Sequence, residues 1–128
     1  MSQGPFIKGT QVINLNKKFY SLGRLKSGEM NKTELAYSRF LEGEKKAGRI
    51  LWFRFEGIKF KLGDNCHYNP DFAVLTSNLQ LEIHEVKGFW QEDARVKIKV
   101  AAEMYPIKFL AVKLNPKKLG GGWEYEEF

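Results

Sequence analysis

The stretch YNPDFAVLTSNLQLEIHEVKG, residues 68–88, contains two apolar runs that are separated by a short polar segment. Residues 71–76 and 80–87 have the length and composition of β-strands, and Ser77-Asn78 between them favours a tight turn. The sequence therefore predicts a β-hairpin. Because successive side chains of a strand point to opposite faces of a sheet, the register of this hairpin decides which polar residues meet.

The expected register pairs the apolar side chains of the two strands with each other. It joins two residue pairs, Leu75 with Leu81 and Ala73 with Ile83. The same register places Asp71 directly opposite Glu85, where opposed Cβ atoms are about 4.5–5.5 Å apart. Lys87 lies one pleat beyond Glu85 on the same face, whereas His84 points to the other face, where we expect a surface or packing residue.

Two carboxylates that meet at the end of a buried sheet face repel each other, and one of them tends to keep its proton. A divalent cation removes this conflict, and hard oxygen ligands suit Mg²⁺ or Mn²⁺. Lys87 can then reach a water molecule or a phosphate, so the three residues suit stabilisation of charge in phosphoryl transfer. The plain alternative is a polar strand end with a surface ion pair.

Four further segments complete the predicted fold. The sequence indicates a helix over residues 31–48, two strands or one broken strand over 49–63, a helix over 92–104 and a strand over 107–115. The order helix, three or four strands, helix, strand predicts an α/β layer in which helices cover a sheet. The expected apolar stripe of the second helix consists of Val96, Val100, Ala101 and Met104.

The motif Pro70-Asp71, followed after thirteen residues by Glu85-Val86-Lys87, resembles the signature of the PD-(D/E)XK nuclease superfamily. The common core of that superfamily, called restriction-endonuclease-like, is a mixed sheet in the order helix, three strands, helix, strand, with flanking helices. The predicted order is similar to this core over residues 31–114. The resemblance is to small phage-type, VRR-type or resolvase-like members, which allows a phage-encoded protein that acts in a bacterial host.

The resemblance implies a site that binds Mg²⁺, with Mn²⁺ as a substitute, and that hydrolyses DNA. Asp71 and Glu85 would be metal ligands together with the backbone carbonyl of Val86, and Lys87 would complete the catalytic set. Glu34, on the first helix, matches a further metal-binding and catalytic glutamate of the family. The alternative role of Glu34 is helix capping, because it falls at the third helical position.

The formal net charge of +6 favours a polyanionic partner. Residues 1–28 contain five basic residues and no acidic one, which is typical of a phosphate-contacting arm and equally of a solubilising terminus. The resemblance implies that polar residues of the second helix steer phosphate, although that helix face could simply be solvated. The candidate DNA-binding residues are Lys17, Lys18, Arg24, Lys26, Gln91, Lys97 and Lys99.

We expect one domain over residues 1–128, with a basic arm over 1–29, the nuclease-like core over 31–114 and a tail over 115–128 whose aromatic residues could dock on the body or on a second subunit. The sequence has a single cysteine, no apolar run as long as a membrane span and no signal-peptide core. These features favour a cytoplasmic, intracellular protein.

The predicted function is that of a Mg²⁺-dependent endodeoxyribonuclease, a phosphodiester hydrolase. Its substrate stays open between branched DNA, as for a Holliday-junction resolvase, and duplex DNA that is nicked or cut without selectivity. A homodimer would favour the first, because a junction needs two active sites. The alternative from another class is a DNA-binding module of the same fold that lacks catalysis.

Overall fold

The computed structural model describes residues 28–87 and 92–128. By its internal contacts the chain divides into two units, Met1–Lys32 and Thr33–Phe128, and the second unit contains the whole sheet. Most of the predicted basic arm therefore lies outside the described residues. None of the helices within the described ranges has both the length and the apolar character needed to cross a membrane.

Two helices, seven strands and one 3₁₀ turn make up this part of the chain. In chain order they are α3 (Lys32–Lys46), β1 (Ile50–Phe55), β2 (Phe60–Gly63), β3 (Cys66–Tyr68), β4 (Phe72–Thr76), β5 (Leu81–Val86), α4 (Glu92–Met104), β6 (Lys108–Leu114), η3 (Lys117–Leu119) and β7 (Trp123–Glu127). The first helix carries an acidic residue in its first turn and Lys45 and Lys46 in its last, which suits the helix dipole.

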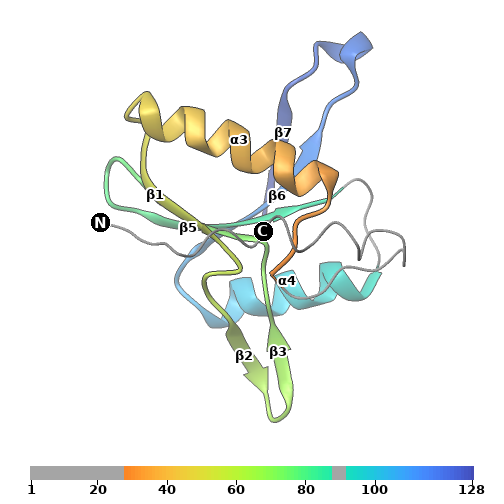
Figure 1. Cartoon of the computed structure of the whole chain (residues 1–128). Helices are drawn as coiled ribbons and strands as arrows, with labels where there is room; N and C mark the ends of the chain where they lie inside the picture. The colour runs from red at the N-terminus through yellow and green to blue at the C-terminus, as the bar shows by residue number, and fades with distance from the viewer. Residues whose placement is uncertain (1–27, 88–91) are drawn as a thin grey trace. The chain divides into compact units, whose positions relative to one another are not determined.

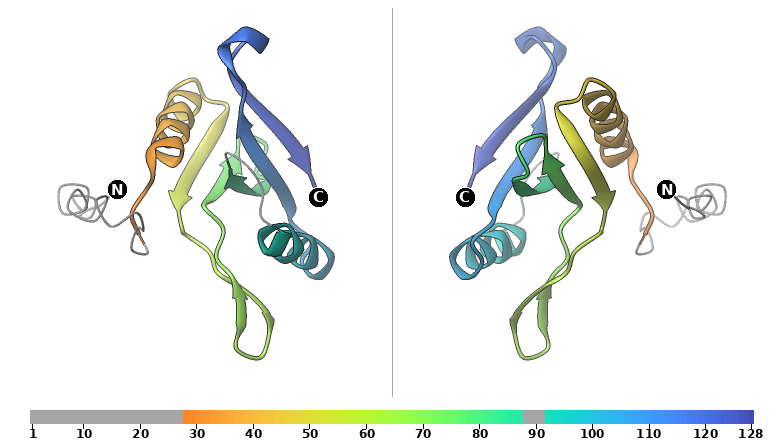
Figure 2. Two further views of the ribbon diagram at one scale, coloured as in Figure 1. Left: turned by 90° about the vertical axis from the view of Figure 1, so that its right-hand side faces the viewer. Right: turned by 90° about the vertical axis from the view of Figure 1, so that its left-hand side faces the viewer.

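Five strands form one mixed sheet in the order β1-β4-β5-β6-β7. β5 and β6 are parallel, and the other neighbouring strands are antiparallel. A parallel pair needs a long crossover, and α4 provides it. Helix α3 covers one face of the sheet, whereas α4 and the small β2-β3 hairpin lie on the opposite side (Figure 1 and Figure 2). The predicted mixed α/β architecture is thus confirmed.

The register of the β4-β5 hairpin is the one that the apolar pattern predicts. Leu75 pairs with Leu81 and Ala73 pairs with Ile83. The turn is closed by a hydrogen bond from the N–H of Leu79 to the carbonyl of Thr76, 2.9 Å long. Continuing this register by one pair beyond the end of β4 brings Asp71 opposite Glu85.

The segment over residues 49–63 contains two strands, and they belong to different sheets. β1 forms an edge of the main sheet beside β4, while β2 pairs with β3 in a separate two-stranded hairpin. The break falls at Glu56, whose positive φ of 49° turns the chain and whose N–H donates to the carbonyl of Asp71 at 2.7 Å. The third strand, Cys66–Tyr68, was not expected from the sequence.

The expected C-terminal tail contains a strand, because β7 extends the sheet antiparallel to β6. Three consecutive glycines, Gly120 to Gly122, have positive φ angles and let the chain reverse after η3. The ring of Trp123 then packs against that of Tyr37 on α3, with centroids 4.9 Å apart in an edge-to-face arrangement. Trp123 therefore docks on the body of its own chain.

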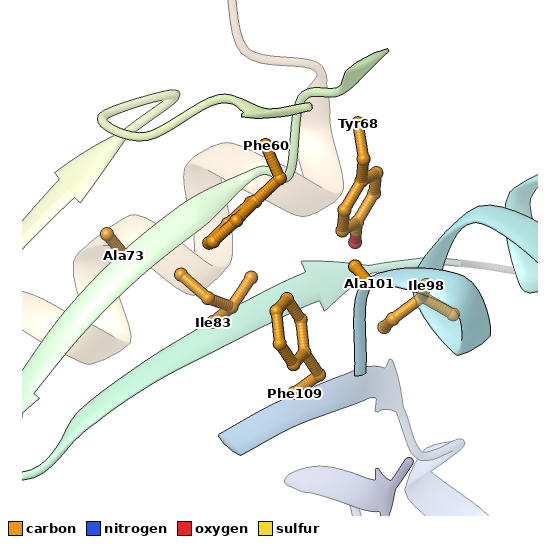
Figure 3. Close-up of a cluster of buried hydrophobic side chains, with 7 residues drawn as sticks. All are labelled: Phe60, Tyr68, Ala73, Ile83, Ile98, Ala101 and Phe109. Carbon is orange, nitrogen blue, oxygen red and sulfur yellow. The ribbon is translucent and has the colours of Figure 1, made fainter. Parts of the chain in front are cut away.

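The predicted apolar stripe of α4 is wrong in three of its four members. Val96, Val100 and Met104 are exposed, and the helix instead buries Ile98 and Ala101 completely. The reason is that Ile98 and Ala101 pack against large aromatic side chains from β2, β3 and β6, which are distant in the chain. Figure 3 shows this core cluster, which consists of Phe60, Tyr68, Ala73, Ile83, Ile98, Ala101 and Phe109.

The orientation of α4 can be tested with a pair of truncations on the same helix. Ile98→Ala should lower the free energy of unfolding by about 2–5 kcal/mol, because it opens a cavity in the core. Val96→Ala should change it by less than about 0.5 kcal/mol, because half of that side chain is already in solvent. Urea denaturation of both variants is the measurement. Equal losses, or a larger loss for Val96→Ala, would contradict this orientation.

Candidate active site

The candidate site lies at the end of the β4-β5 hairpin, where two carboxylates are buried. Asp71 directly precedes β4 and Glu85 is the penultimate residue of β5, and their exposed fractions are only 8% and 6%. The N–H of Val86 donates a 2.8 Å hydrogen bond to Oδ2 of Asp71. This bond ties the aspartate to the neighbouring strand, so both carboxylates stay at one place on the sheet.

Both oxygens of Glu85 have partners. The hydroxyl of Tyr68 donates to Oε1 at 2.7 Å, and Nζ of Lys87 lies 3.0 Å from Oε2. Glu85 is thus held between a neutral donor and a cation. Burial, followed by the charge of Glu85, raises the pKa of the Tyr68 hydroxyl, which keeps this donor protonated.

Sequence reasoning missed Tyr68. It precedes the Pro70-Asp71 motif, but its role depends on the β2-β3 hairpin, which carries its ring into the core beside Phe60 and Phe109. Figure 3 shows the Tyr68 ring among these side chains with its hydroxyl at one end. The only local signal was a tyrosine at the end of a short polar stretch, and that does not indicate a glutamate partner.

The effect of burial and of neighbouring negative charge is seen in the pKa of Asp71. Burial raises the pKa of Asp71 well above its ordinary value, and the negative charges of Glu85 and Glu34 raise it further. The N–H of Val86 and the charge of Lys87 oppose this rise without cancelling it. A protonated aspartate is therefore favoured as long as no additional positive charge is present.

Lys87 keeps its positive charge in this environment. Burial acts to lower its pKa, but the charges of Glu85, Asp71 and Glu34 outweigh that effect, so the pKa is raised. The amine is partly open to solvent, with 32% of the side chain exposed. Lys87 is thus a charged group at the mouth of a buried acidic pair.

Glu34 belongs to the same electrostatic group. It lies in the first turn of α3, and its charge influences both Asp71 and Lys87. This glutamate, 37 positions before Asp71 in the chain, thus acts electrostatically on the hairpin end. Its position in the first helical turn also suits the helix dipole, so the capping role and the site role are compatible.

The remaining predicted site residues are two lysines of α4 and five residues outside the described ranges. Lys97 on α4 is exposed, and its Nζ donates to the carbonyl of His67 on β3 at 3.2 Å. Lys99 is an exposed residue of the same helix. Five further candidates lie outside the described residues, namely Lys17, Lys18, Arg24, Lys26 and Gln91.

Asp71 and Glu85 are the residues that decide whether a divalent cation fits this site. Within residues 28–87 and 92–128, no three His, Cys, Asp or Glu side chains are grouped closely enough to hold a metal ion. Two buried carboxylates in electrostatic conflict are nevertheless hard oxygen ligands of the kind that Mg²⁺ takes, and Mg²⁺ commonly uses only one or two protein carboxylates. The residues therefore fit a cation that completes its shell with water or phosphate.

Comparison with protein-family models, with curated proteins and with solved structures finds no match to this chain. The link to the nuclease superfamily therefore stays a resemblance in the motif and in the order of the elements.

The buried acidic conflict predicts that Asp71→Asn stabilises the metal-free protein. The asparagine keeps an acceptor for the Val86 N–H but cannot ionise. Because the folded-state pKa of Asp71 is raised, its ionisation opposes folding above its unfolded-state pKa. A tenfold difference between the folded and unfolded ionisation constants corresponds to about 1.4 kcal/mol. The gain should be present near neutral pH in EDTA and should vanish below about pH 4, where the unfolded carboxyl is also protonated.

The measurement is the free energy of unfolding across this pH range, with Asp64→Asn as the matched control. Asp64 is almost fully exposed beside Lys61, so its substitution should change little. Mg²⁺ should stabilise the wild-type protein more than Asp71→Asn. A destabilised Asp71→Asn protein near neutral pH would contradict the electrostatic conflict.

Proposed function

We propose that the protein is a metal-dependent endodeoxyribonuclease with a restriction-endonuclease-like core, which hydrolyses phosphodiester bonds of DNA. The observation that carries this proposal is the buried Asp71–Glu85 pair with Nζ of Lys87 3.0 Å from Glu85. A structural role alone does not explain a pair of buried carboxylates at one hairpin end, because it costs stability without a cation. A metal-dependent site for phosphoryl transfer would give such a pair a role, because two carboxylates can hold the cation.

The arrangement of the elements supports the proposal. The helix-strands-helix-strand order is similar to that of the core that the resemblance implies, and the hairpin register brings Asp71 opposite Glu85. Glu34 on α3 adds a third acid to the electrostatic group. Agreement of fold, register and charge is more specific than the short motif alone.

In the proposed mechanism Asp71 and Glu85 would hold Mg²⁺, with Glu34 and the carbonyl of Val86 as further candidates. A bound divalent cation would offset the carboxylate charges and help a water molecule to lose its proton. Tyr68 orients Glu85 through its 2.7 Å hydrogen bond, so that this carboxylate presents a fixed geometry. Lys87, which stays charged, stabilises the negative charge that develops on the phosphate.

DNA is the proposed substrate because the chain has a net charge of +6 and phosphate is the group that this site would attack. The basic residues before position 28 are the proposed contacts to the DNA backbone, with Lys97 and Lys99 as further candidates. Incubation with duplex, nicked, single-stranded and four-way-junction DNA, each with Mg²⁺, Mn²⁺ or EDTA, tests the activity and its substrate form. Cleavage of none of these forms would favour the catalytically inactive DNA-binding module.

The role of Lys87 separates catalysis from binding. Lys87→Ala should lower the single-turnover cleavage rate by about 10²–10³-fold, the scale for removing one preorganised stabiliser of developing charge. Affinity for DNA, measured by gel shift in Ca²⁺, should change little. Lys45→Ala, which removes an exposed lysine from the last turn of α3, is the matched control and should leave the rate unchanged. A variant that loses affinity but cleaves bound DNA at the normal rate would assign Lys87 to binding alone.

A further inference from the structure

A second polar cluster lies on the α3 side of the sheet, opposite the face of Asp71 and Glu85. His84 of β5 was expected at the surface or in packing, but it is buried and has two polar partners. Its Nδ1 lies 2.7 Å from the hydroxyl of Tyr37, and its Nε2 lies 3.0 Å from Oε1 of Glu82. The Tyr37 hydroxyl also lies 3.0 Å from that of Tyr125. These four residues form one hydrogen-bonded chain.

The chain is fully satisfied when His84 is neutral. Tyr125 then donates to Tyr37, Tyr37 donates to Nδ1, and Nε2–H donates to the carboxylate of Glu82. Every donor has an acceptor in this orientation. The negative charge at the end of the chain stays on Glu82, because a neutral imidazole orients the carboxylate without neutralising it.

This chain forms part of the lining of a pocket of about 250 Å³. We name it the α3-face pocket, and it is lined by Tyr37, Phe40, Leu41, Glu44, Ile50, Val74, Glu82, His84, Leu110 and Tyr125. The lining combines three aromatic rings, four aliphatic side chains and two carboxylates, and no lysine or arginine belongs to it. Phe40 and Tyr125 are partly exposed and stand at its rim.

Both carboxylates of the α3-face pocket are ionised near neutral pH. The hydrogen bond from His84 lowers the pKa of Glu82, and the hydrogen bond from Arg49 lowers that of Glu44. Arg49 holds both oxygens of Glu44 from the solvent side, at 2.9 and 2.8 Å, so Glu44 is largely compensated. Electrostatic interactions with His84 and Lys108 also lower the pKa of Glu82, so this carboxylate carries the negative charge of the pocket that Arg49 does not compensate.

We propose that the α3-face pocket binds a small organic cation, an ammonium group that carries alkyl substituents. Aromatic ring faces attract cations, and the partly exposed rings of Phe40 and Tyr125 belong to the lining. The carboxylate of Glu82 adds charge complementarity, and the aliphatic side chains accommodate the alkyl groups. A volume of about 250 Å³ corresponds to roughly eight water molecules in the liquid, which is enough for a ligand of similar heavy-atom number.

Other ligand classes fit the same lining less well. An anion would be repelled by Glu82 and Glu44. A neutral apolar ligand would cover the Glu82 carboxylate without compensating its charge, which costs free energy. The site does not depend on the proposed nuclease activity, because it uses other residues on the other face of the sheet.

Choline and 3,3-dimethyl-1-butanol test the proposal on the unmodified protein. The two molecules have the same shape, but the trimethylammonium group of choline is replaced by a neutral tert-butyl group. Choline should bind at least about tenfold more tightly, which is 1.4 kcal/mol, and should shift NMR resonances of Tyr37, Tyr125 and His84. Equal binding, tighter binding of the alcohol or shifts confined to other residues would overturn the proposal, as would the absence of choline binding at millimolar concentration.

Two variants test whether the charge of Glu82 makes the α3-face pocket prefer a cation. Glu82→Gln should weaken choline binding by about fivefold and leave the alcohol unaffected, because it removes one negative charge and little volume. Glu124→Gln is the matched control, since this exposed β7 residue does not line the pocket. Unchanged selectivity in Glu82→Gln would overturn the role of Glu82. If Glu82→Gln does not fold, the comparison of choline with its isostere in the wild-type protein still decides.

Discussion

The register between β4 and β5 is the constraint on which the rest of the site depends. Pairing Ala73 with Ile83 buries apolar side chains on the α4 face, and the same two-residue period carries Asp71 and Glu85 to one end of that face. A slip of β5 by one residue against β4 would turn Glu85 and every core side chain of β5 toward the other face, while Asp71 would keep its place. The hydrophobic core therefore enforces an electrostatic conflict that the carboxylates alone would avoid, and the hydrogen bond from Val86 to Asp71 holds it in place.

The alternation of side chains along β5 creates two separate chemical environments. Glu85 faces the α4 side, where Tyr68 and Lys87 contact it, whereas Glu82 and His84 reach the α3 side and the hydroxyl of Tyr37. The two clusters are separated by the thickness of one strand but share no hydrogen bond among those described here. The six-residue strand β5 thus directs Glu82 and His84 to one face of the sheet and Glu85 to the other. This explains why a strand in the middle of the sheet carries so many charged and polar residues.

The sequence predicted those features of the fold that depend on interactions between residues close together in the chain. The hairpin register, the helix over residues 92–104 and the last core strand followed from alternation, turn residues and Pro106, all within short windows of sequence. The buried side of α4 was predicted wrongly, because Ile98 is selected by aromatic partners on β2, β3 and β6 that are distant in the chain. Tyr68 and the Tyr37–His84 bond were missed for the same reason: the bonded residues are 17 and 47 positions apart. Glu34 was found only through the family resemblance, since no local pattern links a helix start to the hairpin.

Lys87 bears both on how the buried acidic pair is tolerated and on the metal ion that we propose for it. Its amine contacts Glu85 and opposes the rise in the pKa of Asp71 that burial and the charges of Glu85 and Glu34 cause. The pKa of Asp71 nevertheless stays raised, first by burial and then by the charges of Glu85 and Glu34, so the charge of Lys87 does not offset these effects. A divalent cation would supply the missing charge and at the same time release Lys87 from part of its attraction to Glu85. The lysine would then be available to a phosphate, so the same residue that stabilises the metal-free fold becomes the catalytic cation of the proposed nuclease.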